Sequence, residues 1–313
     1  MSRSHPPTTR SAAWQWPALR RFMALERWIA TRAAQRIWTQ ALYEFVRFGV
    51  KQAWACLFGA LMLGLLIVTH LWYPAGAAIA RYDALFLCAL AIQIAMLRFG
   101  LETWDEAKVI LVFHVVGTAM EIFKTSVGSW AYPEPSVMRI AGVPLFSGFM
   151  YAAVGSYLAR VWRLFDFRFT RHPPLWALVV LSVGIYVNFF AHHYVADVRL
   201  ALFAGAVVAF GPALVHFRVW RTHRTMPLLL GLVLVALFIW FAENIGTFAR
   251  AWAYPHQIGG WQPVSIGKLG AWFLLMIISY TLVALVQGVV CYERPARAGT
   301  VAGAAMARGR TGG

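Results

Sequence analysis

Two glutamates lie inside long apolar runs, and each is followed at a fixed distance by the same aromatic sequence. Glu121 opens a thirteen-residue stretch that ends in Trp-Ala-Tyr-Pro at residues 130–133, and Glu243 opens a second copy that ends at residues 252–255. Six of the thirteen positions are identical, and the copies lie 122 residues apart. An ionisable group inside an apolar helix is costly and usually functional. We therefore expect the function to lie where the two copies meet.

The residue types around each glutamate are compatible with proton transfer. Thr125 and Thr247 follow the glutamates by four residues, so each hydroxyl lies on the helix face of a carboxyl that it could hydrogen-bond. His114, seven residues before Glu121, is a candidate proton relay and equally a core histidine. If the carboxyls of Glu121 and Glu243 meet, their repulsion favours retention of one proton. These five residues are the candidate catalytic groups.

The two aromatic loops supply candidate ligand contacts. Trp130, Tyr132, Trp252 and Tyr254, together with Asn244 beside the second glutamate, would line a pocket next to the carboxyls. Aromatic faces over an acidic site suit a cationic ligand or a carbocation. Belts of tryptophan and tyrosine at the membrane interface are an equally common use of such residues.

The glutamates also have a structural interpretation. Glu121 could pair with Lys124 in the next helical turn, and Glu243 with Asn244 or with a neighbouring helix, so that both serve only to join helices. The repetition of the whole motif favours a functional role over this alternative.

A second group of polar side chains lies at the end of one apolar run. His193 and Asp197 have the i, i+4 spacing of metal ligands on a helix, His192 adjoins them, and His70 aligns with His192 under the 122-residue shift. No single segment contains a complete set of ligands. These four residues are weak metal candidates, and we expect neither a metal nor another cofactor.

The composition indicates a multi-pass integral membrane protein. Hydrophobic residues make up 60% of the 313 residues and charged residues only 13%, against roughly a quarter charged in soluble domains. The mean hydropathy is +0.62. The net charge of +16 comes from basic residues between apolar runs, which is typical of topology signals. We therefore expect membrane lipid and an apolar or amphipathic small molecule as partners, and no nucleic acid.

Eight apolar runs have about the length that a bilayer requires, and lipid-facing backbone must form helices. The predicted fold is all-α, with two parallel repeats of four transmembrane helices related by a pseudo-two-fold axis along the membrane normal. A basic amphipathic helix precedes them. The predicted segments are a disordered tail at 1–12, the amphipathic helix at 13–50, repeat 1 at 53–161, repeat 2 at 175–290 and a disordered tail at 292–313. The runs themselves are 53–73, 79–97, 107–127, 142–161, 175–194, 198–217, 226–247 and 267–290.

The distribution of lysine and arginine predicts the orientation. With eight spans both tails share one side, which carries twenty-two of these residues against six on the other. Because cytoplasmic loops are enriched in basic residues, both termini are predicted to be cytoplasmic and both aromatic loops external. For a bacterial protein this means the inner membrane.

Charged residues near the predicted cytoplasmic side have structural explanations. Thr103 followed by Glu106 is a capping-box pattern, which accounts for the acidic cluster that begins at Glu102. Arg160 and Arg163 are interpreted as orientation determinants.

The two glutamate segments, the apolar layout and the chain length resemble the bacterial integral-membrane family known as domain of unknown function 817, over roughly residues 40–292. The resemblance implies a membrane protein and no particular activity. A local resemblance to membrane carotenoid hydratases and cyclases covers Glu121, Gly128, Trp130, Tyr132 and 142–144. In those enzymes an intramembrane acid is paired with an aromatic loop, although Trp130 here replaces a tyrosine.

Two functions follow from these patterns. The first is a membrane-embedded enzyme in which Glu121 and Glu243 perform acid–base chemistry on a lipid or isoprenoid. The second is a proton-coupled transporter of a small solute, in which the two repeats move about the same carboxyls. A purely structural role for the glutamates is the third possibility.

Overall fold

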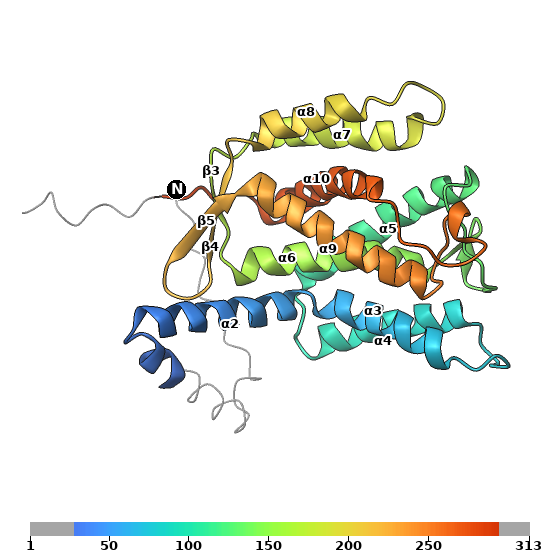
Figure 1. Cartoon of the computed structure of the whole chain (residues 1–313), viewed down its shortest axis with the longest axis horizontal. Helices are drawn as coiled ribbons and strands as arrows, with labels where there is room; N and C mark the ends of the chain where they lie inside the picture. Colours follow the sequence, from blue (N-terminus) through green and yellow to red (C-terminus); the bar gives the residue numbers. More distant parts are fainter. Residues whose placement is uncertain (1–27, 294–313) are drawn as a thin grey trace, which may run out of the picture.

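The computed structural model describes residues 28–293, most of which are helical (Figure 1). The helices are α2 (Ile37–Ala55), α3 (Leu57–Trp72), α4 (Arg81–Arg98), α5 (Trp104–Ser126), α6 (Phe146–Leu164), α7 (Leu175–Ala191), α8 (Arg199–Phe210), α9 (Leu228–Phe248), the short 3-10 helix η2 (Pro255–Gln257) and α10 (Gly267–Gln287). The strands are β1 (Arg139–Ile140), β2 (Val143–Pro144), β3 (Arg168–Thr170), β4 (Leu214–Arg218) and β5 (His223–Pro227).

The long helices run roughly along one axis in three tiers (Figure 1). In this view α7 and α8 form the upper tier, α5, α6, α9 and α10 the middle tier, and α2, α3 and α4 the lower tier. Within the middle tier α5 packs against α6 and α9 against α10. The sheet β3-β4-β5 lies at one end of the helices, and the loops that follow α5 and α9 lie at the other.

The helices occupy the eight predicted apolar runs with ends that differ by a few residues, but two details of the prediction are wrong. The run 198–217 is not one helix: α8 ends at Phe210 and β4 begins at Leu214. Gly211 and Pro212 separate them, and proline disfavours continuation of a helix. The chain is also not all-α, because β1 pairs with β2, and β4 pairs with both β3 and β5.

Several helices are apolar enough for a membrane. In the described part of the chain α5, α9 and α10 are long and apolar enough to span a bilayer. The helices α2 and α3 meet at an angle of 65° and together pass the same test, which gives up to four spans. The helices α7 and α8 are apolar but shorter.

The predicted amphipathic segment 13–50 is only partly described. Its C-terminal part forms the first turns of α2, where Ile37, Trp38 and Phe45 are 83%, 85% and 74% exposed. An exposed apolar surface of this kind suits a membrane interface. Residues 13–27, the predicted tail at 1–12 and all but the first two residues of the predicted tail at 292–313 lie outside the described residues; Tyr292 is described and bonds the Phe169 carbonyl.

The largest apolar core joins α5 through α10. Phe113, Ala152, Leu232 and Ile277 are among its buried members. Close packing of α5 on α6 depends on Gly117, because a Cβ there would lie 2.6 Å from the Tyr151 ring. This glycine lets the Tyr151 side chain lie directly against α5.

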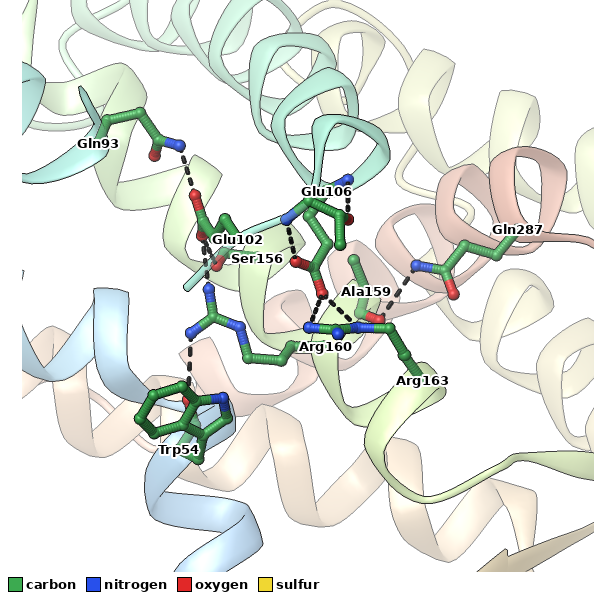
Figure 2. Close-up of polar contacts among 10 residues, drawn as sticks. Trp54, Gln93, Glu102, Glu106, Ser156, Ala159, Arg160, Arg163 and Gln287 are labelled. Carbon is green, nitrogen blue, oxygen red and sulfur yellow. Dashed lines mark hydrogen bonds and ion pairs between the residues drawn. The ribbon is translucent and has the colours of Figure 1, made fainter. Parts of the chain in front are cut away.

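A buried ion pair connects α6 with the chain just before α5 (Figure 2). The side chains of Glu102 and Arg160 are both fully buried, and an oxygen of Glu102 lies 2.7 Å from a guanidinium nitrogen. Ser156 and Gln93 also donate to this carboxylate, and Arg160 donates to the Trp54 carbonyl. The network therefore joins α2, α4, α6 and the chain just before α5.

The predicted capping box at the start of α5 is confirmed. The Thr103 hydroxyl accepts a hydrogen bond from the Glu106 backbone, and the Glu106 carboxylate accepts one from the Thr103 backbone. Glu106 also pairs with Arg163 at 3.0 Å (Figure 2). The interpretation of Arg160 as an orientation signal needs correction, because its buried guanidinium neutralises Glu102 inside the protein.

Candidate functional site

The two aromatic loops meet in space. Ala131 and Ala253, which occupy equivalent positions in the two copies of the motif, form an antiparallel β-bridge with two backbone hydrogen bonds of 2.9 Å. Next to it, the rings of Trp130 and Tyr254 are in edge contact, with centroids 6.1 Å apart. The two motif copies are thereby brought to one place, as their repetition suggested.

Glu121 is buried under three aromatic hydrogen-bond donors. Its Oε2 accepts from Trp130 Nε1 at 2.7 Å and from the Tyr132 hydroxyl at 2.5 Å. Its Oε1 accepts from the Tyr151 hydroxyl at 2.7 Å. Since the residue is only 5% exposed, these donors replace water around the carboxylate.

Glu243 has a similar environment with two donors. Its Oε1 accepts a hydrogen bond from the Tyr254 hydroxyl, and its Oε2 accepts one from Trp272 Nε1 at 2.5 Å. It is 3% exposed. In both motif copies the tyrosine of Trp-Ala-Tyr-Pro therefore donates to the glutamate eleven residues earlier.

The donor types show where a proton could reside on each carboxyl. In both sites Oε2 accepts from an indole N–H, which can only donate. In both sites Oε1 contacts only a tyrosine hydroxyl, which can donate or accept. A proton on either carboxyl is therefore best placed on Oε1, facing Tyr151 or Tyr254.

The loop tyrosines remain protonated in this setting. Burial, followed by the nearby negative charge of Glu121, raises the pKa of Tyr132 well above its usual value. Burial and the charge of Glu243 do the same to the pKa of Tyr254. Both hydroxyls therefore keep their protons at neutral pH and can donate to the carboxyls.

Lys268 lies between the two carboxyl environments. Its Nζ is 4.4 Å from the centroid of the Tyr254 ring and 5.5 Å from that of Trp130. Each of these rings donates to one of the glutamates. Glu121 and Glu243 interact electrostatically, but no direct hydrogen bond joins them within residues 28–293, so the aromatic rings and Lys268 form the connection.

The candidate threonines have other roles than predicted. The Thr247 hydroxyl donates to the backbone carbonyls of Glu243 and Asn244 rather than to the carboxyl, and it accepts from Trp261 Nε1. The Thr125 hydroxyl is buried and has no partner among the described residues. Side-chain to backbone bonding within a helix competes with the bond we expected.

Of the structural pairings considered for the glutamates, those with Lys124 and Asn244 are not found, whereas Glu243 does bond a neighbouring helix through Trp272 of α10. Lys124 Nζ lies 3.0 Å from His193 Nε2 rather than beside Glu121. The Asn244 amide donates to the Trp240 carbonyl and accepts from the Val264 backbone, so it anchors the loop before α10. Both ends of its side chain are thus already occupied.

Among the residues that the structure describes, neither His114 nor Trp252 hydrogen-bonds a glutamate. The His114 ring packs edge-on against Phe149, and its Nδ1 is buried without a partner in the described part of the chain. Trp252 packs closely over Gly246, where a Cβ would lie 2.5 Å from the indole ring. The two copies therefore use their tryptophans differently, since Trp130 bonds its glutamate directly, whereas Trp252 contacts the Tyr254 hydroxyl and packs on Gly246.

The weak metal candidates do not assemble. His70 lies against Phe248, His193 contacts Lys124, and Asp197 accepts from the Asn188 amide. His192 stacks on His193. Across residues 28–293 no three histidine, cysteine or acidic side chains are arranged to hold a metal ion.

A narrow apolar groove leads to the two carboxyl environments. It has an empty volume of about 440 Å³, which includes space open to the surroundings, and it lies among α5, α6, α9 and α10. Tyr151 and Trp272 line it, and their rings are 6.5 Å apart. Tyr151 donates to Glu121 and Trp272 donates to Glu243, so one side chain separates the groove from each carboxyl.

Sequence reasoning missed Tyr151, Trp272 and Lys268. Tyr151 lies thirty residues after Glu121, and Trp272 lies twenty-nine residues after Glu243. The similar spacing from each glutamate is the signal that could have revealed Tyr151 and Trp272. It is hard to see because the two spacings differ by one residue and the residue types differ.

Comparison with known proteins agrees with the family resemblance. A family model described as "Protein of unknown function (DUF817)" matches residues 44–280. The protein YoaT of Bacillus subtilis (strain 168), which is described as uncharacterised, is 43% identical over 250 residues, covering 80% of this chain and 94% of that protein. No solved structure matches.

Proposed function

We propose that this chain, which belongs to the DUF817 family, is a membrane-embedded enzyme that performs acid–base chemistry on a lipid or isoprenoid. The observation that carries this proposal is the groove among α5, α6, α9 and α10. Its lining is mostly apolar, which suits contact with an apolar ligand, and its two polar aromatic residues, Tyr151 and Trp272, each contact a buried glutamate.

The proposed chemistry assigns one proton to the pair of glutamates. Glu121 or Glu243 donates a proton from Oε1 to the substrate, and the other carboxylate accepts one. Tyr151 and Tyr254 adjoin these oxygens and can exchange hydrogen bonds with the carboxyl in either protonation state. Trp130 and Trp272 hold the other oxygens in place.

The first test is the identity of small molecules that remain bound after purification in mild detergent. We expect mass spectrometry to detect a specific lipid or isoprenoid with the wild-type protein. Val116→Phe should reduce its retention about tenfold, because the larger side chain fills the groove.

Val115→Phe is the matched control for this test. Val115 precedes Val116 on α5 but is 60% exposed on the outside of the helix, so its variant should retain the ligand as wild type does. Retention of bulk lipid alone, with no difference between the two variants, would remove the support for a bound substrate. Measurement of proton flux in vesicles would then test the transport hypothesis.

We further propose that the eight helices α3 to α10 cross the inner membrane as two four-helix repeats, with cytoplasmic termini and external aromatic loops. The excess of basic residues on one side and the equivalent Ala131–Ala253 pairing support this arrangement.

In a chain whose cysteines are replaced by serine, Val137→Cys and Ile258→Cys are expected to react with a membrane-impermeant maleimide on intact cells, because both positions are highly exposed. Phe99→Cys, exposed at the other end, should react only after permeabilisation. The reverse pattern would invert the topology.

A further inference from the structure

Five basic side chains gather at the end of the helices that carries the aromatic loops. They are Lys124 of α5, His192 and His193 after α7, Arg199 of α8 and Lys268 of α10. Lys124 interacts electrostatically with both Lys268 and Arg199, and Lys268 interacts with Arg199. The cluster therefore concentrates the positive charge of Lys124, Arg199 and Lys268, which come from α5, α8 and α10.

Lys124 is the least compensated member of this cluster. It is 3% exposed, its Nζ lies over the Phe189 ring at 4.1 Å, and its nearest polar partner is His193 Nε2 at 3.0 Å. Burial and the charge of Lys124 lower the pKa of His193, which favours a neutral imidazole. Within residues 28–293 no carboxylate lies within 4.0 Å of this ammonium group, and a buried cation without a counter-ion is costly.

Asp197 does not neutralise the whole cluster. Its carboxylate accepts from the Asn188 amide at 3.0 Å and from the Arg199 backbone at 2.9 Å, and it pairs with the Arg199 guanidinium at 3.2 Å. Asp197 also attracts Lys124, but one carboxylate does not offset Lys124, Arg199 and Lys268 together. Glu243 also attracts Lys268, but its oxygens are already bonded by Tyr254 and Trp272.

A pocket opens beside these charges. It has an empty volume of about 310 Å³, including space open to the surroundings, and Asn188, His192 and Arg199 are its polar lining residues. Leu275 lines this pocket and also the groove beside the glutamates. The two spaces therefore adjoin the same turn of α10.

We propose that this pocket binds the phosphate group of the ligand whose apolar chain occupies the groove. This inference rests on the proposed function, because the groove supplies the chain-binding half. A phosphate carries nearly two negative charges and several acceptor oxygens, and arginine and lysine are its usual partners in proteins. Arg199 and His192 line the site directly, while Lys124 and Lys268 supply further positive charge beside it.

The test measures binding of three probes to the full-length protein in neutral detergent. The probes are dodecyl phosphate, dodecanol and inorganic phosphate. We expect dodecyl phosphate to bind at least about tenfold more tightly than dodecanol, since charge-assisted hydrogen bonds form only with the phosphate. Inorganic phosphate should bind more weakly and compete with dodecyl phosphate, because it lacks the chain.

Substitutions locate the phosphate contacts. Arg199→Gln and Lys124→Gln should each weaken dodecyl phosphate binding about tenfold and leave dodecanol binding unchanged. Arg98→Gln and Lys108→Gln are the matched controls. Both residues are exposed; Arg98 ends α4 and Lys108 lies near the start of α5, far from the aromatic loops, so neither substitution should change binding. Lys268→Gln provides a second test of the cluster if the Lys124 variant does not fold.

The outcomes separate the two proposals. If wild type binds dodecanol and dodecyl phosphate equally and Val116→Phe weakens the binding of both, the proposal that the groove binds an apolar chain is supported and the phosphate site is overturned. If neither alkyl probe binds, both proposals fail. If inorganic phosphate binds as tightly as dodecyl phosphate, the site takes a free anion and the lipid assignment is overturned.

Discussion

Arg160→Ala is expected to lower the free energy of unfolding by about 3–5 kcal/mol, which is the typical cost of leaving one partner of a buried ion pair uncompensated. The side chains of Arg160 and Glu102 are both fully buried (Figure 2). Without the guanidinium, the Glu102 carboxylate would keep only the bonds from Ser156 and Gln93. Denaturant titration of the purified protein in mixed micelles measures this loss.

Arg163→Ala is the matched control, one turn further along α6. Its guanidinium is half exposed and pairs with Glu106, which keeps its bond to the Thr103 backbone in the variant. We expect a smaller loss than for Arg160→Ala, because Glu106, although only 2% exposed, keeps its Thr103 bond and lies at the N-terminus of α5. Addition of Glu102→Gln to Arg160→Ala should recover part of the stability, because it removes the buried charge. Equal losses of unfolding free energy in the two alanine variants would show that burial of the Arg160–Glu102 pair does not increase its contribution to stability.

Glu121→Gln and Glu243→Gln are expected to lower conversion of the bound lipid or isoprenoid by about a hundredfold or more, the usual contribution of a general acid or base. An amide of the same shape cannot exchange the proton that we assign to Oε1. The effect should appear in turnover, measured by mass spectrometry of substrate and product, and not in retention of the ligand.

The glutamine variants should fold because the surrounding donors can accommodate an amide. The amide oxygen can take the place of Oε2 opposite Trp130 or Trp272, which only donate. The amide nitrogen then faces a tyrosine hydroxyl, which can rotate to accept. Glu121→Asp should fold but misplace the acid, and is a further control. Folded double glutamine variants with full turnover would exclude acid–base roles for both residues.

Local patterns predicted the helices well and the polar contacts only in part. The capping box of Thr103 and Glu106 was predictable because all its atoms lie within one turn of chain. The partner of Glu102 was not, since Arg160 lies fifty-eight residues away and is brought to it by the packing of α6. The strand β4 was hidden in an apolar run, because its pairing with β3 and β5 depends on distant segments.

The sequence by itself determined that this is a largely helical membrane protein of the DUF817 family with two buried glutamates in a repeated motif. Apolar runs of bilayer length must form helices in lipid, and a repeat is visible without a fold. Only the tertiary structure decided what each glutamate contacts. Tyr151 and Trp272 reach Glu121 and Glu243 from neighbouring helices, and the rotation of one helix against another is set by packing along its whole length, which no local spacing encodes.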